Sequence, residues 1–187
     1  MDTKIFSSLI VNEKITPHLE LFLNKAFSFS SSSVQTTKWI AREKYRGGLI
    51  KKGLVKNALV KNGLDAITLN REVIYSGEEV YAHKEEDEFA AWLELIVHEQ
   101  FHRNEIEKLG WVFWYFRYGI ESLRKGYRNA PSEKRAYAVA MGDHCIMENF
   151  LKSDSGREFI SVCKDEYLSQ EEKNRMIERI TVNVVGN

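Results

Sequence analysis

Two histidines and a glutamate in the segment His98-Glu99-Gln100-Phe101-His102 have the types and the spacing of a hydrolytic metal site. Residues four apart lie one above the other on one face of a helix, so both imidazoles can bind a single ion. A catalytic zinc has three protein ligands and one water, and neutral imidazole is a favoured ligand. Glu99 is offset by one residue, which places its carboxylate beside the ion, where it can accept a proton from the water. The pattern predicts metal-assisted hydrolysis with Glu99 as general base.

The residues before the motif are mostly apolar and indicate that the helix carrying it is buried. They include Leu93, Leu95, Ile96 and Val97. A buried helix seldom carries two histidines and a glutamate inward without a partner that satisfies them. This context favours a metal site over the alternative, two surface histidines on an ordinary helix.

The motif supplies two ligands, and a catalytic zinc needs a third. In one known plan a glycine and then a third histidine follow the motif on the same segment. That plan is excluded, because Glu105 stands at the glycine position and Lys108 at the histidine position. The remaining histidines are His18, His83 and His144. A better candidate is a carboxylate on a later helix, as in sites where two histidines and one glutamate hold zinc.

The segment 129–133 has the features of a helix start, and it contains such a carboxylate. Pro131 suits the first helical position, and Glu133 falls in the first turn. From Glu133 one face continues at helical spacing through Ala136, Tyr137, Ala140 and His144. The small residues on this face would let the helix approach the motif helix closely. We expect Glu133 to be the third ligand; its alternative role is only to stabilise the helix N-terminus.

Hydrophobic periodicity and turn residues predict the elements around the motif. Residues 66–69 and 73–76 are typical of two strands of a hairpin, joined by residues 70–72. Other predicted elements are a helix over 13–27, a serine-rich loop over 28–33, a short strand within 36–41, and a helix over 49–59 that Gly63 ends. The acidic stretch 78–88 is expected to be an exposed connection.

The last fifth of the chain, residues 151–187, is predicted as a C-terminal helical extension. Its final β-branched run, residues 180–185, could add a strand. The pattern as a whole predicts an α+β fold, mostly helical, with a small β-sheet or hairpin before the motif helix.

Bulk properties narrow the class of protein. The 187 residues are enough for one domain with a sizeable core. With 27 basic and 27 acidic side chains, no charge excess points to nucleic acid as a partner. No apolar stretch reaches the length of a membrane span, and no signal peptide is visible, so we expect a cytoplasmic protein, with non-classical export as an alternative. Two cysteines, Cys145 and Cys163, are too few for a disulfide framework.

Several segments together resemble a bacterial zincin-like metallopeptidase family that is largely uncharacterised and is often linked to extracellular contractile injection systems. The similar segments are Asp65-Ala66-Ile67-Thr68-Leu69-Asn70, Val73-Ile74-Tyr75-Ser76-Gly77, Leu95-Ile96-Val97-His98-Glu99, and Gly126-Tyr127-Arg128-Asn129 followed by Pro131, Glu133 and Ala136-Tyr137. The resemblance is strongest over 47–137. Three departures are the inserted Ala130, Arg135 where relatives often have a second acid, and the run 100–104.

The resemblance implies one zincin-like domain over 1–187, with a peptide or protein as substrate. It also implies that the hairpin before the motif helix offers an edge strand to an extended substrate. A tyrosine or an arginine often stabilises the developing oxyanion in such sites, and Tyr127, Arg128 and Tyr137 are the candidates here. The oligomeric state is not predicted.

Two other functions fit the same residues. A zinc-containing binding or structural module would cut nothing, and a fourth protein ligand such as His144 would mark it, because structural zinc sites are closed. A toxin or effector with a zincin fold is the other alternative.

An aromatic block after the motif consists of Trp111, Phe113, Trp114, Tyr115, Phe116 and Tyr118. It is expected to pack under the motif helix, the alternatives being a hydrophobic binding wall or a membrane-facing patch.

Overall fold

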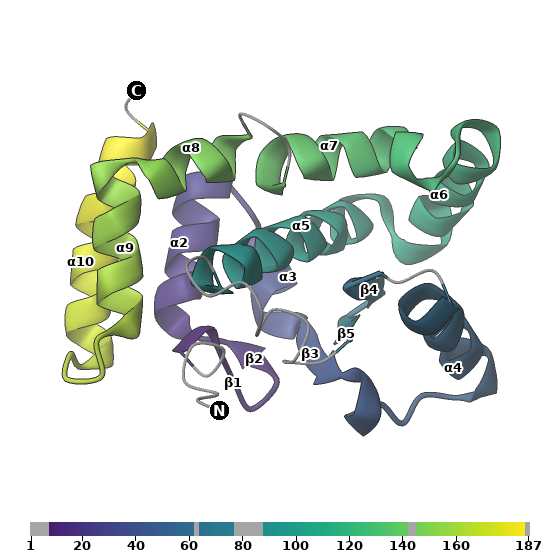
Figure 1. Cartoon of the computed structure of the whole chain (residues 1–187), viewed down its shortest axis with the longest axis horizontal. Helices are drawn as coiled ribbons and strands as arrows, with labels where there is room; N and C mark the ends of the chain where they lie inside the picture. Colours follow the sequence, from purple (N-terminus) through teal and green to yellow (C-terminus); the bar gives the residue numbers. More distant parts are fainter. Residues whose placement is uncertain (1–7, 62–63, 77–87, 142–144, 186–187) are drawn as a thin grey trace.

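The long helix that carries the motif, α5 (Glu88–Leu109), runs through the middle of the molecule (Figure 1). The structure is a computed structural model and describes residues 8–61, 64–76, 88–141 and 145–185. Helices gather at one end of the long axis, while a small sheet lies beside α5 with further helices at the other end. The predicted fold class is confirmed, since the protein is mostly helical with small sheets before α5.

Three short strands form a mixed sheet beside α5. Strand β3 (Lys38–Ala41) pairs in parallel with β5 (Glu72–Tyr75), and β5 pairs antiparallel with β4 (Ala66–Leu69). Strands β4 and β5 form the predicted hairpin, whose turn contains Asn70 in a left-handed conformation. Because the strand order is β3-β5-β4, β4 is an edge strand, and it contacts α5.

One hydrophobic cluster joins the first half of α5 to the helices at the far end of the molecule. These helices are α2 (Pro17–Phe27), α8 (Ile146–Lys152), α9 (Asp154–Lys164) and α10 (Gln170–Val185). The ring of Phe22 lies 4.2 Å from Phe159 and 4.9 Å from Phe150, between ring centroids. Trp92 of α5 and Ile177 of α10 are buried in the same cluster. The C-terminal helices therefore share their core with the motif helix.

Two helices fold back over the half of α5 that carries the motif. They are α6 (Trp111–Lys125) and α7 (Pro131–Ala140), joined through the 3₁₀ turn η4 (Tyr127–Asn129). Gly110 and Gly126 flank α6 with φ of 78° and 79°, a backbone region that favours glycine. Helix α7 starts as predicted, with Pro131 in its first turn and Glu133 buried.

The remaining predicted elements before the hairpin are confirmed in outline. Strand β3 lies within the predicted 36–41, and the 3₁₀ turn η1 (Arg42–Lys44) follows it. The predicted helix over 49–59 is α4 (Leu49–Val55), which continues as the π-helix η2 (Lys56–Lys61). Gly63 and residues 78–87 of the acidic stretch lie outside the described residues.

Two predictions near the N-terminus are wrong. The helix predicted over 13–27 starts only at Pro17, because residues 14–15 form strand β2 (Lys14–Ile15), which pairs with β1 (Ile10–Val11). Thr16 precedes Pro17, and a residue before proline disfavours helical backbone. This explains why the helix starts at Pro17 and not at residue 13. The serine-rich segment predicted as a loop contains helix α3 (Ser31–Thr36), which Ser30 caps by accepting a hydrogen bond from the backbone N–H of Ser33 at 3.0 Å.

The predicted C-terminal strand is also wrong, because residues 180–185 continue helix α10. Ile177 and Ile180 are buried in the core that α10 shares with α2. The Thr181 hydroxyl donates to the carbonyl of Ile177 at 3.0 Å, a bond that helical backbone permits. Packing of one helical face thus overrides the strand preference of the β-branched residues.

Gly156 offers a test of the close contact between α8 and α9. A Cβ at this position would lie 2.0 Å from the carbonyl oxygen of Phe150 and 2.8 Å from the Cα of Leu151. Because backbone atoms cannot move aside, Gly156→Ala should lower the free energy of unfolding by about 1–3 kcal/mol. At Gly119, inside α6, a Cβ meets nothing within 4 Å, so Gly119→Ala should raise it by about 0.5–1 kcal/mol. Urea unfolding of both variants measures the difference, and an unchanged Gly156→Ala variant would contradict the contact.

Candidate metal centre

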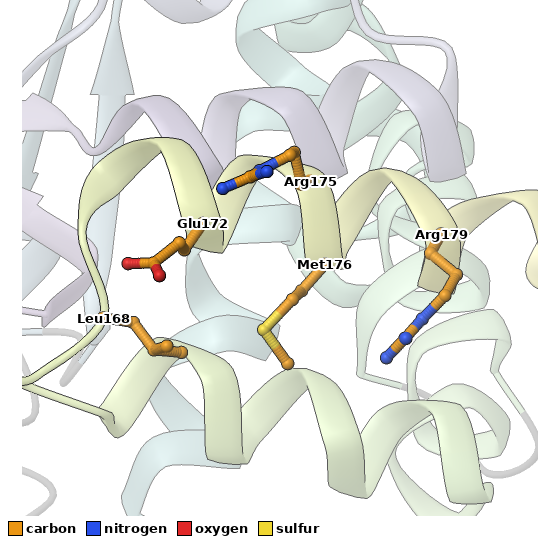
Figure 2. A pocket seen from close by; sticks show the side chains of 5 residues that line it. All are labelled: Leu168, Glu172, Arg175, Met176 and Arg179. Carbon is orange, nitrogen blue, oxygen red and sulfur yellow. The ribbon is translucent and has the colours of Figure 1, made fainter.

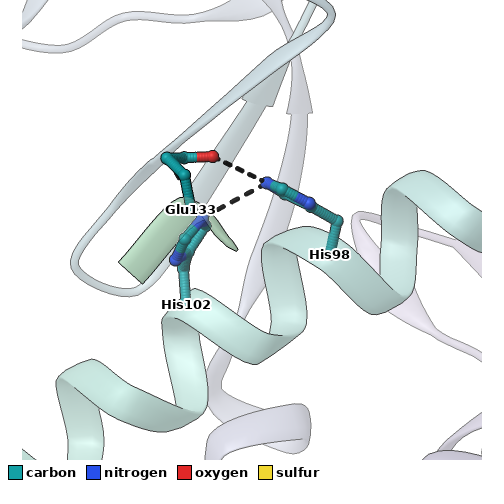
Figure 3. A group of neighbouring side chains, drawn as sticks. All are labelled: His98, His102 and Glu133. Atoms are coloured by element: carbon teal, nitrogen blue, oxygen red, sulfur yellow. Dashed lines mark hydrogen bonds and ion pairs between the residues drawn. The ribbon is translucent and has the colours of Figure 1, made fainter. Parts of the chain in front are cut away.

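The side chains of His98, His102 and Glu133 meet in the interior where α7 crosses α5 (Figure 3). The two Nε2 atoms are 3.2 Å apart. Nε2 of His98 lies 3.4 Å from Oε2 of Glu133, and Nε2 of His102 lies 3.3 Å from Oε1. All three residues are buried. The structure therefore brings together the two motif histidines and the carboxylate that the sequence predicted as their partner.

These separations fit a single bound ion. Ligands that bond at 2.0–2.1 Å in tetrahedral directions lie about 3.3 Å from one another. The Nε2–Nε2 separation of 3.2 Å and the separations of His98 from Oε2 and His102 from Oε1, 3.4 and 3.3 Å, are close to that value, and one ligand atom from each residue lies within 4.8 Å of the other two. In addition, Oε2 of Glu133 is buried and, among the described residues, receives no hydrogen bond beyond the 3.4 Å approach of His98 Nε2. The donor set, two imidazoles and a carboxylate, together with this spacing, could hold a metal ion.

The three groups also perturb each other's ionisation. Burial alone would raise the pKa of Glu133, but hydrogen bonds from His102, His98 and Tyr118 outweigh it and hold the pKa well below its usual range. Burial alone would lower the pKa of His102, but the hydrogen bond and negative charge of Glu133 outweigh it and raise the pKa. Glu133 is therefore anionic at neutral pH, as a metal ligand must be.

Two aromatic residues of α6 hold these ligands in place. The hydroxyl of Tyr118 donates to Oε1 of Glu133 at 2.5 Å. Burial and the nearby Glu133 charge raise the pKa of Tyr118, so its hydroxyl stays protonated and can donate. Trp114 stacks on Tyr118 with 4.8 Å between ring centroids and meets the His102 ring edge-on at 5.6 Å. Since neither histidine Nδ1 has a hydrogen-bond partner among the described residues, this ring packing is what orients His102.

The start of α7, which positions Glu133, is fixed by a carboxylate from α6. Oε2 of Glu121 accepts hydrogen bonds from the backbone N–H and the hydroxyl of Ser132, at 3.0 and 2.7 Å. Its other oxygen pairs with Arg117 at 2.8 Å. Ala130, the inserted residue, is fully buried just before the helix and offers no side-chain cap. Glu121 supplies the cap from outside, which keeps Glu133 in register with the histidines.

An ion pair links α5 to α7 beside the site. The guanidinium of Arg135 donates to Oε1 of Glu105 at 2.8 and 3.1 Å. Oε2 of Glu105 accepts from the indole N–H of Trp114 at 3.2 Å. Glu105, the residue at the glycine position of the excluded plan, thus ties α5 to α6 and α7 beside the site.

Glu99 is anchored by a strand. Its Oε2 accepts a hydrogen bond of 2.5 Å from the hydroxyl of Thr68, on β4. The same hydroxyl also lies 3.4 Å from the backbone carbonyl of Glu99. Glu99 does not belong to the group of three possible ligands, in keeping with its offset in the motif. The hairpin therefore fixes the direction of this carboxylate as well as covering the core.

A cleft of about 120 Å³ opens onto the site. His98 and Glu99 line it together with the three sequence candidates for oxyanion stabilisation, Tyr127, Arg128 and Tyr137. The ring of Tyr137 packs on His98 at 5.0 Å between centroids. Burial, followed by the charge of Glu133, raises the pKa values of both tyrosines, so their hydroxyls remain donors at neutral pH.

The exposed edge of β4 is partly occupied. The hydroxyl of Tyr115 donates to the carbonyl of Thr68 at 3.0 Å and accepts from the backbone N–H of Asn70 at 2.8 Å. Burial raises the pKa of Tyr115 to about 12. An added strand would need this carbonyl and this N–H, which Tyr115 already binds. Ala66, by contrast, lines the cleft at the other end of the strand.

A larger hollow, of about 300 Å³, lies at the far end of the molecule along α10 (Figure 2). Its lining consists of Leu168, Glu172, Arg175, Met176 and Arg179. One carboxylate among two guanidiniums is not a metal-binding set. The volume of a hollow thus does not identify the site, whereas the side-chain chemistry does.

The other histidines do not enter the group of possible ligands in the described part of the chain. His18 is buried away from the site, where its Nε2 lies 3.2 Å from the Thr16 hydroxyl and its Nδ1 lies 3.3 Å from Gln170. His83 and His144 lie outside the described residues. Comparisons with protein families, curated proteins and solved structures found no significant match. Among the described helices, none has the length and apolar character needed to cross a membrane.

Sequence reasoning did not identify the residues that support the ligands. Tyr118, Thr68 and Glu121 each touch the site from an element distant in the sequence. Two features of the sequence could have indicated them: Thr68 is a polar residue within an apolar strand, and Trp114 and Tyr118 are four residues apart on one helix face.

The Tyr118 contact predicts an effect on metal affinity. Tyr118→Phe removes the hydrogen bond to Glu133 while keeping the ring, and loss of such a bond to a ligand typically weakens metal binding about 10–100-fold. Isothermal titration with Zn²⁺ measures the affinity. Tyr167→Phe is the matched control, because that side chain is 98 % exposed and far from the site. Equal affinities of Tyr118→Phe and the control would contradict the positioning role.

The raised pKa of His102 predicts a pH-dependent affinity. Below that pKa the ring carries a proton that competes with the ion, and above it the ring is a free ligand. Zn²⁺ affinity should therefore rise about tenfold per pH unit from acid toward the raised pKa, and then level off. Titrations between pH 5.5 and pH 8, in buffers that do not bind zinc, measure this trend. A flat profile across this range would show that no imidazole proton is displaced.

Proposed function

We propose that this protein is a zinc-dependent metallopeptidase in which His98, His102 and Glu133 hold the ion. The observation that carries the proposal is that the two Nε2 atoms, 3.2 Å apart, meet the carboxylate of Glu133, one oxygen of which lies 3.4 Å from His98 and the other 3.3 Å from His102, beside a cleft that Glu99 also lines. A bound zinc ion would act as a Lewis acid toward the scissile carbonyl and would lower the pKa of a bound water.

Glu99 is the proposed general base. Its carboxylate lines the cleft next to His98 but lies outside the ligand group. The short hydrogen bond from Thr68 holds one oxygen, so the carboxylate is oriented before the substrate arrives. Glu99 would accept a proton from the attacking water and then deliver it to the leaving amine.

Tyr127, Arg128 and Tyr137 are the proposed oxyanion donors. All three line the cleft, and the raised pKa values of the two tyrosines keep their hydroxyls protonated. A developing negative charge on the carbonyl oxygen would receive hydrogen bonds from such groups. Tyr137 has the best-supported position, because its ring packs directly on His98.

The substrate would bind as an extended peptide along the cleft end of β4. Ala66 lines the cleft, whereas Tyr115 already hydrogen-bonds the backbone groups of Thr68 and Asn70. Strand addition could therefore use only a short stretch of the edge. This arrangement favours a substrate that pairs over one or two residues on that side.

Membership of the zincin-like family, and one such domain over 1–187, form part of this proposal. Support comes from the confirmed order of elements: a hairpin, the motif helix, and then a helix that begins with Pro131 and Glu133. A structural zinc module would require a fourth protein ligand, and the ligand group found among the described residues has three. The open cleft at this group favours catalysis over a structural role.

A substitution at Glu99 tests the proposed function. Glu99→Gln should keep zinc, because Glu99 is not a ligand, yet lose cleavage by about 100-fold or more, because an amide cannot accept the proton. Metal analysis and a peptide-library cleavage assay measure the two properties. Glu88→Gln, in the first turn of the same helix, is the matched control. Zinc loss in folded Glu99→Gln would make Glu99 a ligand, and undiminished cleavage would assign the activity elsewhere.

A further inference from the structure

The outer face of α6 carries a continuous apolar stripe that no described residue covers. We define it as Val112, Phe113, Phe116, Ile120 and Leu123, which are between 37 and 89 % exposed. Their spacing of three and four residues places them on one side of the helix. The opposite side holds Trp114 and Tyr118, which pack at the metal centre. The aromatic block thus divides into an inner face, as predicted, and an outer face that meets solvent.

The surroundings of the stripe are positively charged. From Lys108 to Arg128 the sequence contains five basic residues and one acid, Glu121, although the whole chain has no net charge. Glu121 is already bound to Arg117 and Ser132. Arg124 and Lys125 are exposed at the end of α6. An apolar stripe with a basic border is the pattern of a helix that lies in the surface of an anionic membrane.

The position of α6 suits such a surface. The helix lies at one end of the long axis of the molecule (Figure 1). At the same end, α4 exposes Leu49 and Ile50, 90 and 83 % accessible, next to Lys52. The exposed aromatic rings Phe113 and Phe116 belong to the types that enter a lipid interface.

We propose that the protein docks peripherally on anionic lipid surfaces through the stripe on α6. A second copy of the chain fits less well, because pairing two identical stripes would bring two basic borders together. Docking would place α6 between the lipid surface and the metal centre, since Trp114 and Tyr118 on its opposite side pack there. This inference does not depend on catalysis.

Vesicle co-sedimentation of the full chain tests the proposal. We expect binding to mixed phosphatidylcholine–phosphatidylglycerol vesicles, weakened by salt, and little binding to phosphatidylcholine alone. The double variant Phe116→Ser/Leu123→Ser should bind at least about tenfold more weakly. Arg124→Gln/Lys125→Gln should lose about fivefold per charge. Tyr167→Ser, which removes an exposed aromatic residue elsewhere, should bind like the wild type.

Several outcomes would overturn the proposal. Failure of the wild type to bind anionic vesicles is one, and undiminished binding by the folded stripe variant, checked by circular dichroism, is another. Light scattering after size-exclusion chromatography measures the oligomeric state and so tests the remaining alternative, docking of a second copy of the chain. A wild-type dimer that Phe116→Ser/Leu123→Ser converts to a monomer would assign the stripe to a second copy.

Discussion

The structure depends on a close approach between the start of α7 and the middle of α5. Two imidazoles on α5 and the carboxylate of Glu133 on α7 can share one ion only if their atoms meet within about 3.3 Å. Ala136 and Ala140, both fully buried, leave room for that approach. Glu121 caps the first turn of α7 from α6, so the register of Glu133 is set by a residue on another helix. The other helices then bury the remaining faces of α5.

Buried polar groups are costly unless each has a partner, and this site satisfies that rule through a chain of contacts. Tyr118 donates to Glu133, Trp114 packs on Tyr118 and His102, and Glu105 accepts from both Trp114 and Arg135. Within the site, the Nδ1 atoms of both histidines are buried without a hydrogen-bond partner among the described residues, and Oε2 of Glu133 has the Nε2 of His98 near it at 3.4 Å. A metal ion at this point would satisfy that carboxylate oxygen.

The sequence predicted those parts of the site that depend on local spacing. His98 and His102 are four apart on one helix, and Pro131 with Glu133 marks the start of another. Residues that reach the site across the fold, such as Thr68 and Glu121, leave no such periodic signal. The same limit explains the incorrect strand at 180–185, because only tertiary packing of Ile177 and Ile180 shows that this β-branched run is helical. One sequence therefore predicts site residues that share a helix, but it does not predict the residues of distant elements that hydrogen-bond or pack against them.

Helix α6 shows how one run of aromatic residues can perform two tasks. The helical period turns Trp114, Tyr115 and Tyr118 inward, where they orient His102, seal part of the β4 edge and hold Glu133. This inner face of α6 already packs against α5, η4 and α7. The remaining apolar residues, including Phe116 and Leu123, therefore have no core left to enter. Because both faces belong to one rigid helix between Gly110 and Gly126, whatever binds the outer stripe also fixes the orientation of the metal cleft.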